Sequence, residues 1–380
     1  MRAPGWMLPA VIGALAAGCS TGCTTSTPGD SSSPPASPGA STSSAPAVPP
    51  PDPLPANSPE AIKPPPPSVP RGPVSVTLVG DLMLTRGVPD ASDALAPMSP
   101  RLRNADLTVG NLEMTLSTDG APTQGDDSFG SGPAVLGPLR RAGFDALSLA
   151  NNHSGDYGRR AMLDTVARIR ESPIVPFGVG RDLVAASRPA YLRVGGTTFA
   201  LLGFNAIGET PRATSTDAGA LGVRMPPRTG PLVRADLAHL ARVIRQADRQ
   251  ADAVIVLPHW GTQYTHEPEP IQRAVSRRLV AAGADLVVGG HPHWVQGVES
   301  VRGVPVVHSL GNFVFDMDFM AETMQGIVLE TTWRGGELRR IRFVPYAMTP
   351  GTFAPRVVRG ARAEEILADL RGTSSGRWAP

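Results

Sequence analysis

The chain contains five short apolar runs, and each leads directly into a side chain that can bind a metal ion. Such runs are typical of buried β-strands, because a strand covered on both faces is apolar along its whole length. The carboxyl ends of neighbouring parallel strands lie at one edge of a sheet, so the loops that follow them can converge on one crevice. The runs are VTLVGD ending at Asp81, TVGNLE at Glu113, ALSLANNH at His153, VIVLPH at His259 and LVVGGHPH at His293.

Helices are predicted between these runs, since apolar residues recur there at helical spacing. The clearest are LDTVARIRES, DLAHLARVIRQADRQ and PIQRAVSRRLVAAG. Strands that alternate with helices, with hairpins mixed in and at the end, predict a layered α/β or α/β/β/α domain. We expect this domain over residues 74–355, followed by a C-terminal helix and tail over residues 356–380.

The N-terminus has the pattern of an export signal. Arg2 is followed by an apolar run, too short for the ~20 residues that span a membrane, and then by small residues before Cys19. We therefore predict that residues 1–23 are a lipoprotein-type signal peptide and lipobox, with the lipid on Cys19, and that the protein is extracytoplasmic and membrane-anchored. Cleavage near Ala17 by an ordinary signal peptidase would make it a secreted protein instead, and Cys23 is a second candidate for the lipid.

Residues 24–73 consist almost entirely of Ser, Thr, Pro, Ala and Gly. Such a segment buries too little apolar surface to offset the entropy of ordering, so it is predicted to be a disordered linker. The formal net charge of the whole chain is only +2, and no basic block is interleaved with aromatic residues. Nucleic acid is therefore an unexpected partner. Both cysteines lie at the signal boundary, so no disulfide is expected in the folded part.

The polar residues after the apolar runs form a set that suits divalent ions such as Zn, Mn, Fe or Mg, without distinguishing between them. The candidate metal ligands are Asp81, Glu113, Asn152, His259, His291 and His293. These ligands exceed the need of one site, so we expect two ions that share a carboxylate and activate a water or a substrate oxygen. Each residue alone has a structural alternative; Asp81, for instance, could cap a helix or lie in a turn.

The same motifs resemble those of the CapA family, the bacterial capsule or poly-γ-glutamate synthesis proteins. The resemblance runs from about Val76 to Pro350 and keeps the order of the family's motifs. They are VTLVGDLML, GNLEMTL, FDALSLANNHSGDYG, PHWGTQYTHEPEPIQ, GADLVVGGHPHWVQGVE and HSLGNFVFD. This family is related in fold to the calcineurin-like metallophosphoesterases, which implies a four-layer α/β/β/α sandwich with a dinuclear metal centre.

The resemblance also implies a role for each site residue. One ion would be held by Asp81, Glu113 and His293. The second ion would share Glu113 and add Asn152, His259 and His291. His153 would act beside the substrate as a general acid or an orienting group. The residues expected to contact the substrate are Arg86, Tyr264 and Asn312.

Two positions depart from the related patterns. Met83 stands where phosphoesterases usually carry a histidine, which leaves the first ion short of a ligand, although CapA relatives generally also have an apolar residue there. Gln263 stands where CapA relatives typically have a glutamate.

Two functions remain open at this stage. The first is an exported metal-dependent enzyme that acts on a cell-envelope polymer, a peptide or a phosphate-containing substrate. The second is a non-catalytic, membrane-anchored subunit that binds or exports an acidic polymer. Either function would place the protein with the machinery of capsule synthesis or export.

Overall fold

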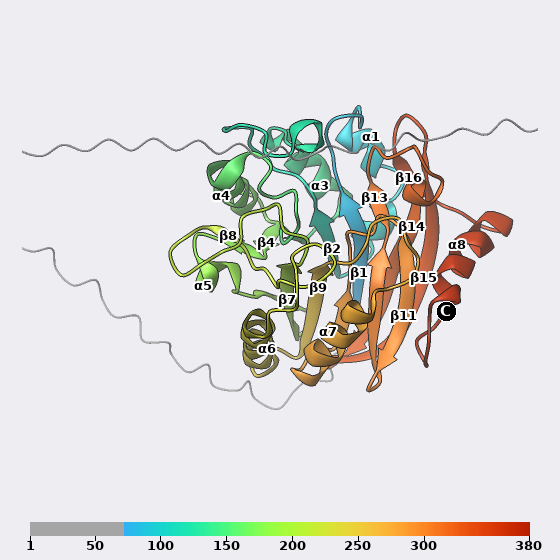
Figure 1. Ribbon diagram of the computed structural model, residues 1–380. Coiled ribbons are helices and arrows are strands. Elements are labelled where there is room, and N and C mark those ends of the chain that lie inside the picture. Colours follow the sequence, from blue (N-terminus) through green and yellow to red (C-terminus); the bar gives the residue numbers. More distant parts are fainter. Residues whose placement is uncertain (1–71) are drawn as a thin grey trace, which may run out of the picture. The chain divides into compact units, whose positions relative to one another are not determined.

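Two β-sheets form the centre of the computed structural model, which describes residues 72–380 (Figure 1). The predicted signal peptide, the lipid site at Cys19 and the linker up to residue 71 lie outside the described residues. Within residues 72–380, no helix combines the length and the apolar composition needed to cross a membrane.

The first sheet has the strand order β16-β15-β14-β1-β2-β3-β4, and β13 pairs with β1 off this path. Its parallel part runs from β1 to β4, and its antiparallel part from β1 to β16. Its strands are β1 (Val74–Leu82), β2 (Leu107–Leu112), β3 (Ala146–Ser148), β4 (Val175–Phe177), β13 (Asn312–Val314), β14 (Gln325–Arg334), β15 (Glu337–Thr349) and β16 (Ala354–Val357).

The second sheet has the strand order β11-β12-β10-β9-β7-β6. Its central strands are parallel, and the two edge strands pair antiparallel with their neighbours. Its strands are β6 (Ala190–Val194), β7 (Thr197–Asn205), β9 (Ala253–His259), β10 (Leu286–Val288), β11 (Val295–Val301) and β12 (Val304–Leu310). A small separate pair consists of β5 (Val179–Gly180) and β8 (Gly219–Ala220).

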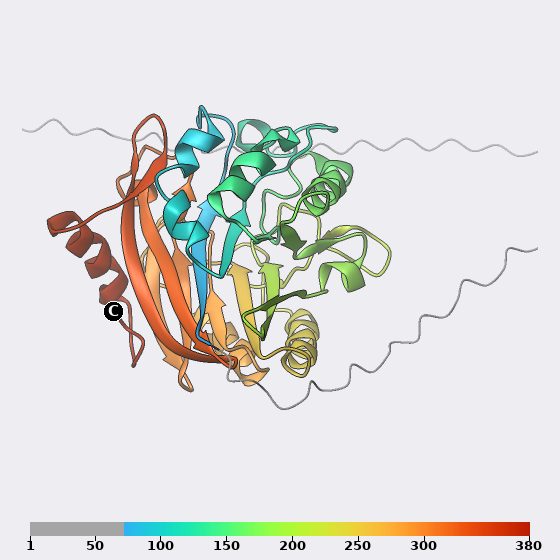
Figure 2. The same ribbon diagram turned by 180° about the vertical axis from the view of Figure 1, so that it is seen from behind.

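Helices cover the outer face of each sheet (Figures 1 and 2). The first sheet carries α1 (Ala91–Leu95), α2 (Ser99–Arg103), α3 (Leu136–Ala142) and α4 (Gly158–Arg170), and the second carries α6 (Arg234–Asp248) and α7 (Pro270–Ala281). One buried cluster fills the space between each sheet and its helices, and a third joins the two sheets. This arrangement confirms the predicted four-layer α/β/β/α sandwich.

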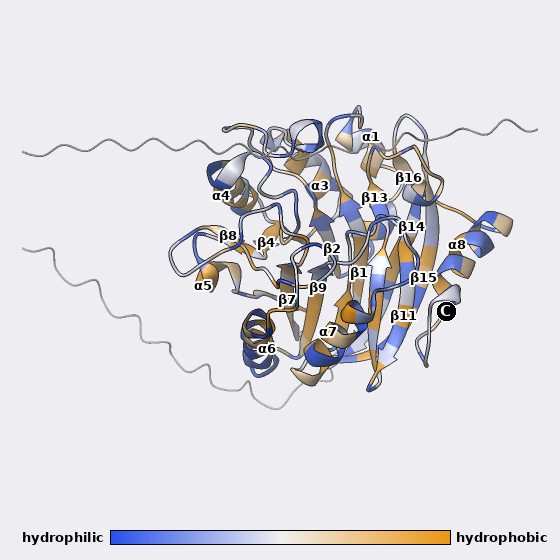
Figure 3. Cartoon of the chain, in the orientation of Figure 1, coloured by the Kyte–Doolittle hydropathy of each residue, from blue (hydrophilic) through white to orange (hydrophobic). Residues whose placement is uncertain are grey.

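Strand β9 shows why the sequence specifies four layers. Its side chains alternate, so that Val254 and Val256 pack under the outer helices while Ile255 and Leu257 pack against the other sheet. Both faces are buried, which explains the continuous apolar run. Helix α6, in contrast, is apolar along one side and polar along the other (Figure 3).

The C-terminal segment packs on the same fold. Helix α8 (Ala361–Gly372) places Ile366 and Leu370 in the cluster between the sheets and lies beside β11 and β15 (Figure 1). After the helix, the hydroxyls of Thr373 and Ser374 accept hydrogen bonds from the backbone of β11. The short α5 (Leu183–Ala186) lies next to β5.

Asp285, just before β10, makes the stability of the fold depend on pH. Its carboxylate accepts a hydrogen bond from the Val254 backbone N–H at 2.8 Å. Burial nevertheless raises the pKa of Asp285 from 3.8 to about 6. The folded state therefore holds this proton more tightly, and the stability that it contributes below the unfolded pKa is lost as pH rises through the folded pKa.

We expect Asp285→Asn to melt at a similar temperature to the parent near pH 4 and at a higher temperature at pH 8, because asparagine can accept the same hydrogen bond without a charge. Melting temperatures measured between pH 4 and 8 test this. The control is the same exchange at exposed Asp217, where the Thr214 hydroxyl helps to lower the pKa. The melting temperatures of this variant and the parent should differ by a constant amount over this pH range. If the melting temperatures of Asp285→Asn and the parent differ by the same amount at every pH, the prediction is wrong.

Candidate metal centre

Strand ends from both sheets meet at one place. In the first sheet, Asp81 pairs in register with Asn111 of β2 and with Asn312 of β13. In the second sheet, His259 at the end of β9 pairs with Asn205 of β7 and bridges to Gly290. The two sheets approach closely here, since a Cβ on Gly290 would lie 2.6 Å from Asp81 Oδ1. The loops after these strands therefore share one crevice, as the sequence predicted.

A compact cluster of three buried side chains lies in this crevice. One ligand atom each from Glu113, His259 and His291 falls within 4.8 Å of the others. His259 Nε2 lies 3.4 Å from Glu113 Oε1 and 2.8 Å from Asn152 Oδ1. These four residues are the set that the resemblance assigns to the second ion.

Two atoms of this cluster lack the partners that buried polar atoms normally have. Glu113 Oε1 and His291 Nδ1 are buried and form no hydrogen bond. Such orphaned atoms beside a third ligand atom fit a site built for a cation. A carboxylate oxygen, an amide oxygen and imidazole nitrogens also suit Zn, Mn or Fe. The residues present therefore fit a divalent ion.

The ligands assigned to the first ion lie beside the cluster, and Asp81 and His293 already have hydrogen-bond partners within the protein. Asp81 accepts hydrogen bonds from the Asn111 side chain at 2.8 Å and from the His291 backbone N–H at 3.1 Å. His293 Nδ1 lies 2.8 Å from Asn312 Oδ1, and its ring centroid is 5.9 Å from that of His291. Among the described residues, these ligand atoms do not form as compact a group as those of Glu113, His259 and His291.

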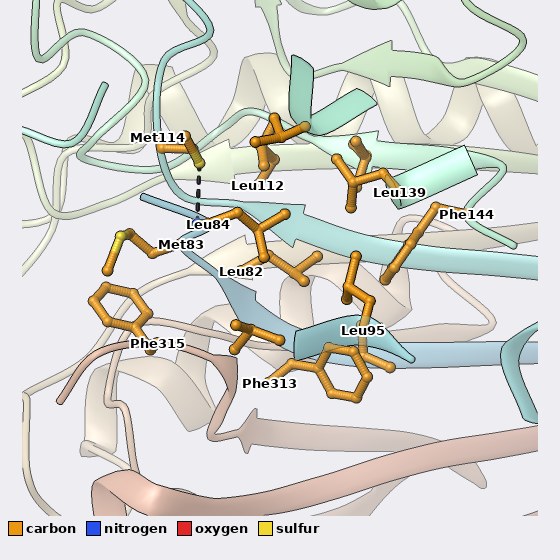
Figure 4. Packing of buried hydrophobic residues seen from close by; sticks show 14 of the residues in the cluster. Leu82, Met83, Leu84, Leu95, Leu112, Met114, Leu139, Phe144, Phe313 and Phe315 are labelled. Carbon is orange, nitrogen blue, oxygen red and sulfur yellow. Dashed lines mark hydrogen bonds between the residues drawn. The ribbon is translucent and has the colours of Figure 1, made fainter. Parts of the chain in front are cut away.

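Met83 belongs to the hydrophobic core and does not replace the ligand that the first ion lacks. It is fully buried and lies near Phe315 in the cluster under the outer helices (Figure 4). The next residue, Leu84, donates its backbone N–H to the sulfur of Met114 at 3.2 Å. The position at which the resemblance expects a metal-binding histidine is therefore part of the packed core.

Burial sets the charge state of the cluster. It lowers the pKa of His259 to about 4 and lowers the pKa values of His291 and His293 below 6.5. All three imidazoles are therefore neutral at pH 7, the form that binds metal. Burial and the charge of Glu113 raise the pKa of Asp81 to about 7, and burial raises the pKa of Glu113. A bound cation would stabilise the ionised form of these buried carboxylates.

His153 is held beside the cluster by a carboxylate. Its Nδ1 lies 2.8 Å from Asp156 Oδ2, and its Nε2 lies 3.9 Å from Glu113 Oε1. The ring stacks on Phe129 with centroids 4.1 Å apart. Burial opposes protonation, but the hydrogen bond to Asp156 and the charge of Glu113 raise the pKa of His153 overall. The ring is thus oriented with Nε2 toward the cluster.

The three residues expected to contact the substrate differ in their surroundings. Asn312 is fully buried, lies with its side-chain oxygen 2.8 Å from His293 Nδ1 and donates to the Thr323 carbonyl, so it can orient His293. Arg86 forms an ion pair with Asp316 and lies over the Phe129 ring. Tyr264 lies with its ring 5.9 Å from that of His293. Contact of Arg86, Tyr264 and Asn312 with substrate stays a prediction.

Three polar residues around the cluster were not identified as site residues from the sequence. The Asn111 side-chain amide reaches Asp81, Glu113 and His259. Asp156 bonds His153, and its position three residues later in the same loop was a usable signal. Glu209 accepts a hydrogen bond from the Asn152 amide at 2.8 Å.

Unusual backbone conformations gather at this site. Among the described residues, seven that are not glycine have a positive φ. Five of them belong to the site or its rim: Arg86, Glu209, Tyr264, His291 and His293. Each such residue costs about 1–3 kcal/mol and persists where the surroundings hold it. The site is therefore strained by its own loops.

The chain matches a known protein family and relatives from two Bacillus species. The model of the family described as "Bacterial capsule synthesis protein PGA_cap" matches residues 75–317. The "PGA biosynthesis protein CapA" of Bacillus subtilis (strain 168) is 29% identical over 314 residues, 80% of each chain. The "Capsule biosynthesis protein CapA" of Bacillus anthracis is 30% identical over 295 residues, 74% of this chain and 69% of the other.

A solved structure with a similar fold is the 5'-nucleotidase precursor from Thermus thermophilus. Its TM-score is 0.46 at 17% sequence identity, covering 78% of this chain and 58% of the other. All the candidate ligands, from Asp81 to His293, lie within the region that the family model matches.

Proposed function

The chain belongs to the bacterial capsule synthesis protein family PGA_cap, and from this premise we propose that it is a metal-dependent, hydrolase-like enzyme of capsule or poly-γ-glutamate biosynthesis. The observation that carries the proposal is the buried cluster of Glu113, His259 and His291, in which two polar atoms have no hydrogen-bond partner. The proposed substrate is a cell-envelope polymer, a peptide or a phosphoester.

The roles of the side chains follow from their positions. Glu113, Asn152, His259 and His291 would hold one divalent ion, which when bound polarises a substrate oxygen and lowers the pKa of water. Asp81 and His293, with Glu113 shared, are the proposed set for a second ion.

His153 is the proposed general acid. Asp156 holds its Nδ1–H, so a proton on Nε2 faces the cluster and can pass to a leaving group. Asp156 thus orients the His153 ring, and His153 supplies the proton.

A substrate panel tests the function. The purified protein is stripped of metal with EDTA, resupplied with Mn²⁺, Zn²⁺, Fe²⁺ or Mg²⁺ singly, and assayed on phosphomonoesters, phosphodiesters, α-peptides and γ-glutamyl peptides. We expect turnover of one class that disappears without metal. Turnover that is indifferent to EDTA, or none in a protein that binds metal, would defeat the enzymatic proposal.

The buried Met83 favours a second candidate, a non-catalytic subunit that binds or exports an acidic polymer, because it leaves the first ion without one ligand. Binding of metal and of poly-γ-glutamate, without turnover in the same panel, is the result that this candidate requires.

We further propose that the protein acts outside the cytoplasm, anchored through a lipid on Cys19, within or beside the machinery of capsule synthesis or export. Cys19→Ala is expected to move the protein from the membrane fraction to the soluble extracellular fraction, as judged by immunoblotting. If the parent protein is already soluble outside the cell, secretion without a lipid is the better description.

A further inference from the structure

Both polar atoms of the Asn152 side-chain amide have a close partner. The oxygen lies beside a histidine nitrogen, and the nitrogen donates to a carboxylate. Its oxygen lies 2.8 Å from His259 Nε2, inside the metal cluster. Its Nδ2 donates to Glu209 Oε2 at 2.8 Å. An amide can bind a metal ion only through its oxygen. The group that holds the nitrogen therefore decides whether Asn152 can serve as a ligand.

Glu209 lies in the loop that follows β7, a strand of the opposite sheet. Its backbone has a φ of 62°, and its other carboxylate oxygen forms an ion pair with Arg228. Two neighbouring contacts tie this loop to the loop of Asn152. The Asn205 amide donates to the Asn151 carbonyl at 3.1 Å, and the Thr210 hydroxyl accepts from the Gly155 N–H at 2.9 Å. These contacts hold the two loops together, and Asn152 and Arg228 each engage one oxygen of the Glu209 carboxylate.

We propose that Glu209 is a positioning residue for the metal centre, which fixes the Asn152 amide with its oxygen toward the ion, while Arg228 holds the carboxylate in place. The inference rests on the proposed function, because it assumes that the cluster binds a divalent ion. Without Glu209 the amide is free to rotate and to present its Nδ2 to the ion. Groups that orient metal ligands in this way typically account for about 10- to 100-fold in affinity.

Calorimetric titration of the metal-free protein with Mn²⁺ tests the inference. Glu209→Ala is expected to weaken Mn²⁺ binding about 10- to 100-fold. Glu209→Gln should lose less, because its amide oxygen can still accept from Asn152 Nδ2. The melting temperature of each metal-free variant should stay close to that of the parent, since alanine and glutamine bear the same strain at this φ. Glu364→Ala, which removes another carboxylate paired with an arginine, is the matched control.

A second pair of variants separates positioning from general electrostatics. In an Asn152→Asp background both side-chain terminal atoms are oxygens, so there is no amide to orient. Glu209→Ala should then leave Mn²⁺ affinity unchanged or improve it. A loss of affinity in this background as large as in the parent would overturn the inference, because it would show a plain effect of charge.

The outcomes distinguish this inference from the function on which it rests. If the parent protein binds Mn²⁺ and Glu209→Ala binds it equally well, the inference fails and the metal centre stands. If the parent protein binds no divalent ion under any condition, both fail.

Discussion

Glu113→Gln is expected to weaken Mn²⁺ binding by at least about 100-fold and, in the same protein, to raise the melting temperature of the metal-free form. The first effect exceeds what groups that merely orient ligands account for, because Glu113 supplies a ligand atom to the cluster. The second effect follows because the carboxylate is fully buried and Oε1 has no hydrogen bond. Glutamine has nearly the same size and no charge, so the metal-free fold loses a destabilising group.

Calorimetry measures the affinity, and thermal melting in EDTA at pH 8 measures the stability of the metal-free form. Glu364→Gln, the same exchange on the exposed surface of α8, should change neither quantity. A lower melting temperature together with weaker binding would mean that Glu113 supports the fold and is not a ligand held ready for an ion. Unchanged Mn²⁺ affinity would show that Glu113 is not a metal ligand.

His153→Gln is expected to lower kcat by about 10²- to 10⁴-fold on the substrate identified by the panel, with little change in Mn²⁺ affinity. The reason is that the His153 ring lies beside the cluster with Nε2 directed to it, while Asp156 holds the opposite nitrogen. A general acid matters most for poor leaving groups. The loss should therefore shrink for substrates whose leaving group needs no proton, such as nitrophenol.

Asp156→Asn provides the companion measurement. It keeps a side chain of the same shape beside His153 Nδ1 and removes the charge that helps to raise the pKa of the ring. We expect a smaller fall in kcat than for His153→Gln, with the alkaline limb of the kcat–pH profile moved to lower pH, because a general acid must be protonated and its pKa is lowered. Equal losses for good and poor leaving groups in both variants would argue that these residues only shape the site.

The strand ends of the site could be predicted because their signal is local. An apolar run that continues to a histidine, an aspartate or a glutamate places that side chain at a carboxyl end, and the register of β1, β2 and β9 bears this out at Asp81 and His259. The four layers follow in the same way, since runs buried on both faces need cover on both sides.

Glu209 escaped prediction because the strand before it is not among the five apolar runs that lead into a metal-binding side chain. Strand β7 does pair antiparallel with β6, but it also pairs parallel with β9, which aligns its end with that of β9. Partners on the far side of a strand leave no trace in the local pattern. Glu209 lies four residues beyond the strand end, so spacing did not indicate it either.

Asn312 illustrates a different limit. Its motif places it near the site, and the structure agrees, but the motif does not say which way the side chain faces. That direction depends on how the chain passes from β12 in one sheet to β13 in the other, where a Cβ on Gly80 would meet the Gly311 carbonyl oxygen at 1.8 Å. Only the tertiary crossing shows that the Asn312 side chain contacts His293 Nδ1.

The two sheets supply the cluster jointly, Glu113 from the first and His259 with His291 from the second. The ligands are thus far apart along the chain and come together only once both halves have folded against each other. An unfolded chain does not bring these three side chains together and so offers no such site. Metal binding at this cluster is therefore expected to require the folded protein, and to be lost on unfolding.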